Sequence, residues 1–290
     1  MKTNELFRDR TVLSFEVFPP KPTSDETVIY KTLEELAKLR PDCVSVTYGA
    51  GGGANCDKTV QIASDVKNKY GIESVAHLPC VYLSENDAVN ILDKLKANGI
   101  ENILALRGDI SENTAPNGRF SHANELIEFI CERYDFNIIT ACYPEKHFEA
   151  ESLSEDLTHL KNKVDSGAAQ LITQLFLDNR YFYDFLEQAR KIGINVPVEA
   201  GIMPVVNAKQ ITRMVKLCGI KLPEKFRKVI EKYGDNPTAM YDAGIAYAID
   251  QIVDLLSQGV DGIHLYTMNN AYVAERIYNA VYSLISVKTG

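Results

Sequence analysis

Short apolar runs alternate with longer amphipathic stretches from one end of the chain to the other. The runs hold five or six residues, which is typical of strands buried on both faces. The stretches between them repeat apolar residues at helical spacing, as Leu33 and Leu36 do in a helix with Ser24 as its expected N-cap. Strands are predicted at residues 13–18, 43–48, 74–78, 103–107, 137–142, 171–176, 198–203 and 262–267. Helices are predicted at residues 24–39, 57–70, 84–98, 152–166, 180–191, 208–218, 223–233, 238–257 and 271–287, with one more ending at residue 134.

This order of elements predicts a (β/α)8 TIM barrel. Strands that each lead into a helix run parallel, because parallel neighbours need a crossover connection, and a closed barrel buries them on both faces. Such barrels take about 250 residues, so a single barrel domain over residues 1–290 accounts for the chain. Three helical segments stand between strands seven and eight, which places an extra helix there as an elaboration of the barrel.

Composition narrows the class of protein. The chain is 46% hydrophobic and 24% charged, as ordinary globular proteins are. Its net charge of −8 argues against nucleic-acid binding, which needs clustered Lys and Arg. The six cysteines form no C-x-x-C pair, the start of the chain lacks the apolar run of a signal peptide, and no 18-residue apolar stretch exists. We therefore expect a cytoplasmic enzyme or small-molecule binder with no nucleic-acid or membrane partner.

Polar residues stand at the carboxyl ends of the predicted strands. Arg107, Gly108 and Asp109 close the fourth strand, where charged groups are costly inside a core but natural at the rim of a barrel. The same arrangement recurs at Glu16, Thr47, Tyr48, His77, Tyr143 and Gln174. Because the active sites of these barrels lie at the carboxyl ends of the strands, we predict one site assembled from several strand ends.

A glycine-rich loop follows the second strand. Residues 49–54 fit the dinucleotide fingerprint G-x-G-x-x-G/A between a strand and a helix. In that fingerprint an acidic residue at the end of the next strand binds the ribose. Here the acidic residue at about the right distance is Glu73, which precedes the next predicted strand and does not end it. The glycines therefore indicate close approach of a ligand to the backbone, with a plain flexible loop as the alternative.

Two carboxylates are the candidates for catalysis. Glu16 lies between Phe15 and Val17, and if these apolar neighbours line its pocket, burial favours the protonated form that a general acid needs. A buried structural ion pair is the alternative for Glu16. Asp109 stands at a strand tip, and its alternative is a surface acid paired with Arg107.

The histidines do not indicate a metal site. His77 and His147 lie near strand ends, but no H-E-x-x-H motif or close cluster of His, Cys and acidic residues accompanies them. Asp156, His159 and Lys163 share one face of a predicted helix, which is either an exposed charged face or part of a ligand site. The other two histidines are interpreted as structural, His122 and His264.

Taken together, these segments resemble the methylenetetrahydrofolate reductase family, whose members are flavin enzymes of one-carbon metabolism. The resemblance keeps the family's order over nearly the whole chain, at residues 14–21, 46–52, 77–78, 106–109, 143–147, 163–168, 172–176 and 201–205. The length is similar to that of the short bacterial form, which lacks the regulatory domain of the animal enzymes.

The resemblance implies an FAD-bearing barrel that reduces 5,10-methylenetetrahydrofolate to 5-methyltetrahydrofolate, with the flavin reduced beforehand by NADH, NADPH or a partner subunit. Glu16 matches the family's general acid, and Asp109 matches the carboxylate near flavin and pterin. Gln174 matches a pterin-binding amide, and Gln210 matches an amide on the folate tail. The matches to FAD contacts are Thr47, Tyr48, Ala50, His77, Arg107, Gly108, Asp109, Ala123, Tyr143, His147, Ala150, Asp156 and Lys163.

Some positions depart from the family pattern. Met214 stands where relatives carry a Phe that packs on nicotinamide, which leaves the electron donor open. Asn270 stands where an Arg often meets the folate tail, and we keep it as a predicted substrate contact. His159 and Asn162 stand where an Asn and an Arg lie near the flavin phosphates, and we keep both as predicted cofactor contacts.

Two other functions fit the same barrel. One is a folate-binding methyltransferase without flavin, and the other is a non-catalytic folate- or flavin-binding protein that serves a partner. A pure binder has no need of a general acid, so Glu16 and Asp109 argue against the second. We also expect a homo-oligomer.

Overall fold

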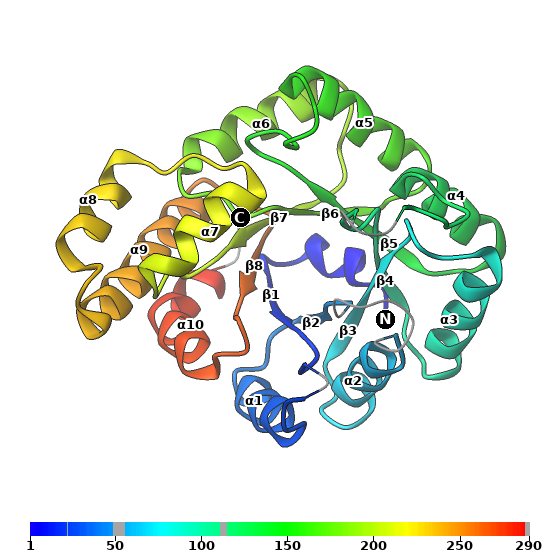
Figure 1. Ribbon diagram of the computed structural model, residues 1–290, viewed down its shortest axis with the longest axis horizontal. Coiled ribbons are helices and arrows are strands. Elements are labelled where there is room, and N and C mark those ends of the chain that lie inside the picture. Colours follow the sequence, from blue (N-terminus) through cyan, green and yellow to red (C-terminus); the bar gives the residue numbers. More distant parts are fainter. Residues whose placement is uncertain (22, 49–55, 111–114, 288–290) are drawn as a thin grey trace.

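A computed structural model gives the fold of the chain and describes residues 1–21, 23–48, 56–110 and 115–287. Parallel strands close into a barrel in sequence order, with the last strand paired to the first (Figure 1). Helices lie around the outside of the barrel. The predicted (β/α)8 TIM barrel is therefore confirmed.

The elements follow the predicted order. The strands are β1 (Val12–Val17), β2 (Cys43–Val46), β3 (Glu73–Pro79), β4 (Asn102–Leu106), β5 (Asn137–Cys142), β6 (Gln170–Thr173), β7 (Val198–Ile202) and β8 (Gly262–Tyr266). The helices are the 3-10 helix η1 (Thr3–Arg8), then α1 (Thr27–Lys38), α2 (Cys56–Asn68), α3 (Glu85–Ala97), α4 (Ala123–Arg133), α5 (Leu153–Asp165), α6 (Asn179–Lys191), α7 (Ala208–Cys218), α8 (Glu224–Tyr233), α9 (Pro237–Ser257) and α10 (Ala271–Ile285). Apart from the start of α1 and the end of β6, the predicted boundaries lie close to these.

Local hydrogen bonds explain the two larger differences. The backbone N–H of Ser24 closes a turn of its own, with a carbonyl oxygen at 2.9 Å. Helix α1 therefore begins at Thr27, whose N–H donates to Asp25 Oδ1 at 2.9 Å, and the prediction of Ser24 as N-cap was wrong. Strand β6 ends early because Gln174 turns its own Oε1 onto the N–H of Leu175 at 2.8 Å. The spacing of apolar residues carries no information about such turns.

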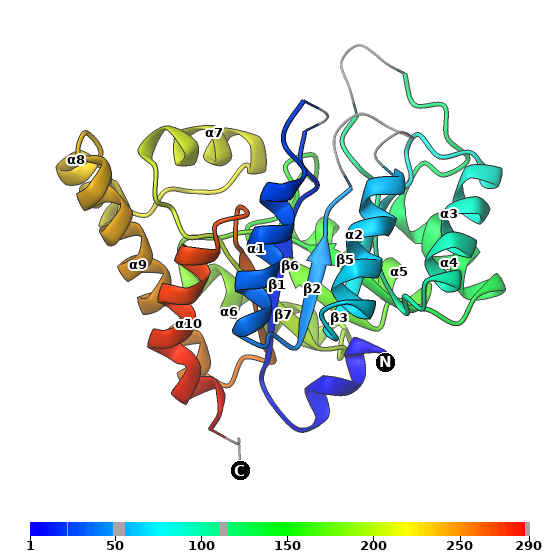
Figure 2. The ribbon, with the colours of Figure 1, turned by 90° about the horizontal axis from the view of Figure 1, so that it is seen from below.

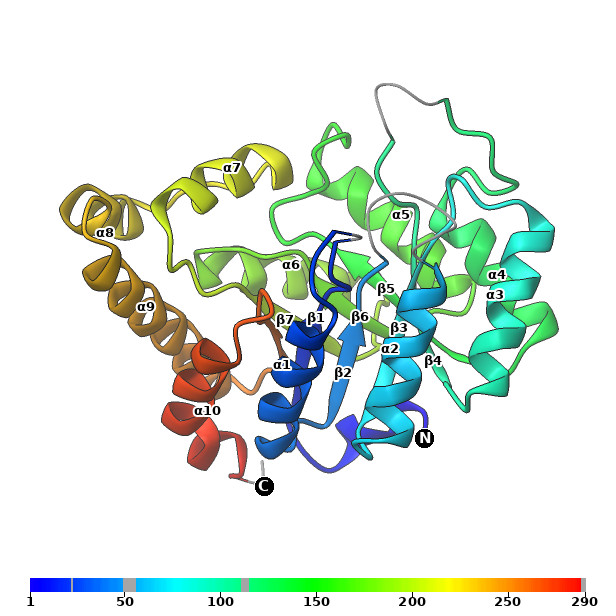
Figure 3. The same ribbon diagram turned by 60° about the horizontal axis from the view of Figure 1, so that its bottom comes forward.

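The region between β7 and β8 carries three helices, as the apolar pattern predicted. Helix α9 is the crossover helix, because it packs against β7, α6 and α10. Helices α7 and α8 are therefore both additional, and the insertion is two helices rather than the one extra helix expected. Figures 2 and 3 show α7 on the side of the carboxyl ends of the strands.

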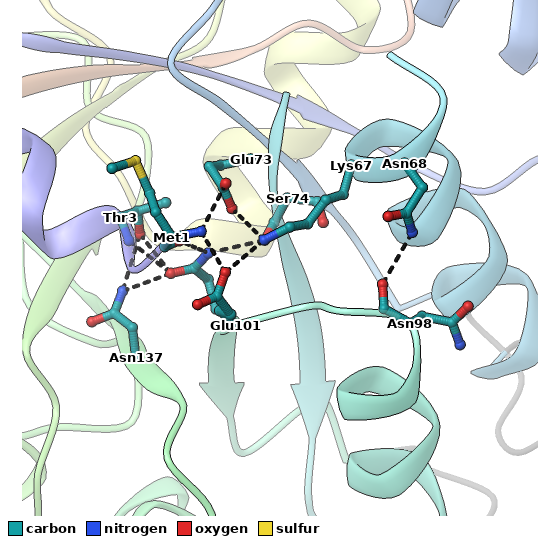
Figure 4. A network of polar contacts seen from close by, with 10 residues as sticks. Met1, Thr3, Lys67, Asn68, Glu73, Ser74, Asn98, Glu101 and Asn137 are labelled. Carbon is teal, nitrogen blue, oxygen red and sulfur yellow. Dashed lines mark hydrogen bonds and ion pairs between the residues drawn. The ribbon is translucent and has the colours of Figure 1, made fainter. Parts of the chain in front are cut away.

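Polar contacts tie the amino end of the barrel to η1, an element that the apolar pattern did not predict (Figure 4). Thr3 Oγ1 donates to Gln170 Oε1 at 2.8 Å, and Asn137 Nδ2 donates to Thr3 Oγ1 at 3.0 Å. Nearby, Lys67 Nζ donates to Glu73 Oε2 at 2.9 Å. These contacts occupy the amino end of the barrel, which leaves the carboxyl end for a ligand.

Candidate active site

The strands bring several predicted site residues to one end of the barrel. Glu16 lies on β1 and His77 on β3. Arg107, Tyr143 and Gln174 come directly after β4, β5 and β6. Because the strands run parallel in a closed barrel, their carboxyl ends form one rim. The structure therefore places these five residues at a common rim, and their roles in function stay predictions.

Glu16 faces the inside of the barrel, not an apolar pocket as expected. Successive side chains of a strand point to opposite faces, and Phe15 and Val17 are buried in the core that the strands form with the surrounding helices. Glu16 Oε2 instead lies 3.6 Å from Nε2 of His77 and 3.6 Å from Nε2 of His264. Its side chain keeps 18% of its surface exposed. The expectation about its neighbours was wrong, and imidazoles take the place of the apolar groups.

His264 is the site residue that the sequence pattern did not reveal. It was interpreted as structural, yet one ring nitrogen lies next to Glu16 and the other, Nδ1, lies 2.7 Å from Ser14 Oγ. Strand β8 pairs with β1 so that His264 stands opposite Ser14 in the register. The alternation of side chains along the last strand, combined with closure of that strand onto the first, was the signal that could have identified it.

The two imidazole rings leave polar atoms available beside the Glu16 carboxyl. Within the described part of the chain, Nε2 of His77 and Nε2 of His264 are buried and have no hydrogen-bond partner. Burial lowers the pKa of His77 to about 4, so its ring is neutral at neutral pH. Buried polar atoms without a partner are costly in free energy. The arrangement is therefore suited to hold a proton, or a polar atom of a ligand, beside Glu16.

The loop after β4 is shaped by Gly108. Its φ is +87°, a conformation that favours glycine, and an added Cβ would lie 2.8 Å from Pro79 Cβ. Arg107 turns its guanidinium onto Glu149, with Nη1–Oε2 and Nη2–Oε1 distances of 2.6 and 2.8 Å. Asp109 is exposed at the same rim. Since Arg107 is engaged by Glu149, the alternative of Asp109 as the surface partner of Arg107 is not favoured.

Aromatic and charged groups of the loop after β5 meet helix α5. The rings of Tyr143 and His147 make an edge contact with centroids 4.7 Å apart, and the backbone N–H of His147 donates to Asp156 Oδ2 at 3.0 Å. Lys163 Nζ donates to the Ala141 carbonyl oxygen at 2.6 Å. Burial raises the pKa of Asp156 and lowers the pKa of Lys163. Asp156 and Lys163 thus contact β5 and its loop, which favours the ligand-site interpretation for these two residues, whereas His159 of the same helix face is exposed.

Other predicted cofactor contacts lie at varying distances from the rim. Ala123 is buried at the start of α4, and the Ala150 carbonyl oxygen accepts a hydrogen bond from Lys146 Nζ at 2.6 Å. His159 and Asn162 are exposed. Asn162 lines a surface groove formed by residues of α4 and α5, on a different side of α5 from the face that carries Asp156 and Lys163. The structure therefore does not bring Asn162 together with the rim residues.

The end of β2 is described only in part. The Thr47 carbonyl oxygen accepts a hydrogen bond from Thr59 Oγ1 at 3.1 Å, which ties the strand end to α2. Tyr48 is half-buried and packs against the main core. Ala50 and the rest of the glycine-rich segment at 49–54 lie outside the described residues, so the predictions made there stay predictions.

The side chains predicted to contact the substrate differ in whether they already make hydrogen bonds that hold the fold. Gln174 is half-buried after β6, and Gln210 lies in the first turn of α7. Asn270 is the N-cap of α10, where its Oδ1 accepts from the Val273 N–H at 3.2 Å. Its Nδ2 donates to the Tyr241 hydroxyl at 3.0 Å. The amide of Asn270 is therefore engaged in holding the helix, whereas Gln210 has no such capping role.

The described residues contain neither a cluster of metal ligands nor a membrane-spanning helix. In those parts of the chain, no group of three or more His, Cys, Asp and Glu side chains could hold a metal ion. No helix of the same parts is long and apolar enough to cross a membrane. What the rim offers is a carboxyl group for proton transfer at Glu16 and cationic or hydrogen-bonding groups at Arg107 and Lys163 for an acceptor-rich ligand.

Comparison with known proteins points to one family. A family model described as methylenetetrahydrofolate reductase matches residues 2–282. "Methylenetetrahydrofolate reductase (NADH) 1" of Arabidopsis thaliana is 36% identical over 275 residues, which cover 90% of this chain and 46% of the plant protein. The 5,10-methylenetetrahydrofolate reductase of Escherichia coli (strain K12) is 34% identical over 265 residues, covering 91% of this chain and 88% of that protein. The chain thus spans about half the length of the plant relatives it matches.

Solved structures agree with the fold. A protein from Clostridium thermocellum, described as binding two copies of 5-methyl-5,6,7,8-tetrahydrofolic acid, superposes with a TM-score of 0.67 at 15% identity, covering 97% of this chain and 98% of that one. A dihydropteroate synthase from Coxiella burnetii superposes with a TM-score of 0.53 at 13% identity, covering 96% of this chain and 94% of that one. At these identities the likeness shows the fold alone.

Proposed function

The chain belongs to the methylenetetrahydrofolate reductase family, and from that premise we propose that it is an FAD-dependent enzyme that reduces 5,10-methylenetetrahydrofolate to 5-methyltetrahydrofolate. The observation that supports this most is the Glu16 carboxyl at the rim, with Nε2 of His77 and Nε2 of His264 at 3.6 Å. An acid in that position can give a proton to a ligand bound over the open end of the barrel. The proposed catalytic unit is the barrel domain over residues 1–290.

The proposed reaction balances with one hydride and one proton. The hydride adds to the methylene carbon of the folate, and the proton goes to the ring nitrogen that this carbon leaves. Bound FAD would supply the hydride after accepting one from the electron donor. Glu16 supplies the proton, which favours opening of the five-membered ring and leaves a carboxylate beside His77 and His264.

The described residues fit an FAD molecule. A flavin ring presents oxygen and nitrogen atoms that accept hydrogen bonds, and its diphosphate carries negative charge. The buried Nε2 of His77 lacks a partner in the described chain, and the charged ends of Arg107 and Lys163 lie at the same end of the barrel. Gly108 keeps a turn there that a Cβ would obstruct. The proposed FAD contacts are Thr47, Tyr48, Ala50, His77, Arg107, Gly108, Asp109, Ala123, Tyr143, His147, Ala150, Asp156, His159 and Lys163. Asn162, which lines the groove between α4 and α5 and not the rim, is left out of this set.

Folate contacts are proposed on the side of β6 and α7. Gln174 and Gln210 carry amides, which both donate and accept hydrogen bonds as the edge of a pterin requires. Asp109, exposed after β4, is the proposed carboxylate near flavin and pterin. Asn270, whose amide caps α10, is proposed as a weak contact of the folate tail.

The proposed electron donor is a nicotinamide. The plant relatives carry NADH in their names. Met214 on α7 packs against a small core that includes Met203, and its flexible thioether can adapt to a flat ligand. NADPH and an electron-delivering partner subunit are the other donors to be tested. We propose a cytoplasmic homo-oligomer as the working form.

The experiment is purification of the chain followed by separate assays with NADH, NADPH and a low-potential donor. Bound FAD should give absorbance near 450 nm that bleaches with the true donor. Addition of 5,10-methylenetetrahydrofolate should then yield 5-methyltetrahydrofolate in step with the donor consumed. Colourless protein that takes up no added FAD, or flavin that never passes electrons to the folate, would contradict the proposal.

A further inference from the structure

A series of polar side chains leads from Glu16 into the barrel core. Nδ1 of His264 lies 2.7 Å from Ser14 Oγ, and Ser14 Oγ also contacts Glu199 Oε2. On the other side of the ring, Nε2 of His264 lies 3.6 Å from Glu16 Oε2, about 0.4 Å beyond the usual N–H···O range. Glu199 and His264 are fully buried. Two carboxyl groups, one at the rim and one in the core, are thus connected through a hydroxyl and an imidazole.

The orientation of Glu199 is fixed from the amino end of the barrel. Thr3 Oγ1 and Asn137 Nδ2 both donate to Gln170 Oε1, at 2.8 and 3.3 Å. Gln170 must therefore present its Nε2 to Glu199, and it donates to Oε1 at 2.6 Å. The second carboxyl oxygen, Oε2, is the one that contacts Ser14. A proton on Glu199 is consequently best placed on the oxygen that leads toward the rim.

We propose that Glu199, Ser14 and His264 form a proton relay that positions and reloads the Glu16 acid, an inference that rests on the function proposed above. All three act through Glu16, so they are positioning residues, and Glu16 is the residue that meets the folate. The relay gives Glu16 a proton source inside the barrel while the ligand covers the open end. Burial raises the pKa of Glu199, which suits a group that stores a proton.

One proton is transferred in total, by a concerted shift of three bonds. Before transfer, Glu199 carries the proton on Oε2 and donates to Ser14, whose hydroxyl donates to Nδ1 of His264. In that state the Nε2–H of His264 faces the Glu16 carboxylate. After transfer, Glu16 carries the proton, His264 is protonated on Nδ1, and Ser14 donates to the Glu199 carboxylate. Three bonds to hydrogen break and three form, and the relay keeps a single negative charge throughout.

The titratable groups around the relay do not divert the proton. Burial lowers the pKa of His77, whose Nε2 faces the same Glu16 oxygen, to about 4 and keeps that ring neutral. Burial raises the pKa of the Cys43 thiol and of the Tyr266 hydroxyl well above their usual values, so both stay protonated. Burial is the largest cause of the raised pKa of Glu199, whereas His264, Ser14 and Gln170 lower that pKa and the Asp42 carboxylate raises it.

Glu199→Gln isolates the relay without changing the size of the side chain. Because Gln170 donates to Oε1, the introduced amide must direct its NH2 group to Ser14 and donate to it. Ser14 then always donates to Nδ1 of His264, which fixes the Nε2–H tautomer. In the wild-type protein the Nδ1–H tautomer becomes available whenever Glu199 gives up its proton.

Nitrogen NMR of the imidazole groups in the full chain measures this tautomer directly. The His264 signals are identified by their loss in His264→Asn. We expect the wild-type His264 to populate the Nδ1–H tautomer increasingly as the pH is raised over the range in which the protein stays folded, and Glu199→Gln to show only the Nε2–H tautomer. The same tautomer in both proteins across this range would overturn the relay.

The folate half-reaction shows whether the relay serves catalysis. In Glu199→Gln the acid must be reloaded from solvent, so we expect folate reduction by the reduced protein to slow about tenfold at pH 8 and about twofold at pH 6. Flavin reduction by the nicotinamide donor should not change. Thr140→Val, which removes another buried hydroxyl that donates to the Ala105 carbonyl oxygen at 3.2 Å, is the control and should leave both rates within about twofold. Equal slowing at both pH values, or of both half-reactions, would show a merely structural role and overturn the proposal.

Ser14→Ala interrupts the relay at its middle and replaces Glu199→Gln if that variant does not fold. We expect the same pH-dependent loss of folate reduction, together with a His264 tautomer that no longer changes with pH. A wild-type protein that reduces no folate at any pH would refute the function proposed above. The imidazole spectra need no substrate, and they then decide the relay by themselves.

Discussion

Replacing Glu16 by Gln should divide the proposed reaction into its two halves. Reduction of the flavin by NADH needs no proton from Glu16, whereas reduction of the folate does. The substitution keeps the size of the side chain and exchanges a hydroxyl for an NH2 group. That group can donate toward Nε2 of His77, which lies 3.6 Å from the carboxyl oxygen and has no hydrogen-bond partner in the described part of the chain. The fold and FAD binding should therefore survive the change.

The expected decrease in the rate of folate reduction follows from the fact that the Gln amide cannot act as an acid. A positioned general acid contributes about 10²–10⁴-fold to a rate, or about 3–5 kcal/mol of transition-state free energy. The Glu16 side chain is 18% exposed, which leaves solvent a route to the reacting nitrogen. We therefore expect folate reduction to fall by about 10²–10³-fold, the lower part of that range, with the residual rate rising as the pH falls.

Anaerobic stopped-flow absorbance near 450 nm measures both half-reactions. Oxidised protein is mixed with NADH in one experiment, and photoreduced protein is mixed with 5,10-methylenetetrahydrofolate in the other. Glu132→Gln makes the same chemical change on a side chain of α4 that is 69% exposed, and it should leave both rates unchanged. Equal slowing of both half-reactions by Glu16→Gln, or an undiminished folate rate, would refute the assignment of Glu16 as the acid.

Three further changes test the surroundings of the site. Burial lowers the pKa of His77 from 6.5 to about 4. As the pH falls, the unfolded chain is therefore protonated at this histidine before the folded chain is. The folded state is favoured by about 3 kcal/mol above pH 6.5, and this contribution is lost as the pH falls toward 4. His77→Asn should flatten this part of the pH dependence of the unfolding free energy in urea, and an unchanged slope would contradict the assignment. Gly108→Ala should lower stability in thermal unfolding by about 1–3 kcal/mol and weaken FAD binding, because φ is +87° and the Cβ would lie 2.8 Å from a side-chain carbon. Gly99→Ala, at φ +74° with open space around it, is the control and should cost about 1 kcal/mol, so equal costs would count against a steric conflict. Glu149→Gln releases Arg107 from an exposed ion pair worth about 0.2–1 kcal/mol and should tighten FAD binding up to about fivefold in a fluorescence titration, whereas weaker binding would place Glu149 among the ligand contacts.

The barrel could be predicted from the sequence because its signals are local and repeated. Each apolar run and each amphipathic stretch is recognisable in its own window, and parallel closure follows from their alternation. The predictions failed where single hydrogen bonds decide, as at Ser24 and Gln174. Helix η1 was missed because a short 3-10 helix carries no apolar repeat that a window could detect.

The site could be predicted only in part, because its members come from strands far apart in the sequence. His77 stands near the end of a strand, where a polar residue indicates a position in the site. His264 and Glu199 lie within apolar strands and read as core positions. Only the pairing of β8 with both β1 and β7 brings them to Ser14 and Glu16, and the residue pattern of a single strand does not contain that information.

The measurement that tests the proposed function most directly is electron transfer from the reduced, FAD-loaded protein to the folate. The protein is reduced anaerobically, freed of excess donor and mixed with 5,10-methylenetetrahydrofolate, while absorbance near 450 nm and the folate products are followed together. We predict that the flavin absorbance returns and that 5-methyltetrahydrofolate forms in an amount equal to the flavin. Flavin that stays reduced in the presence of excess folate, or 5-methyltetrahydrofolate that forms equally well in protein free of flavin, would contradict the proposed function.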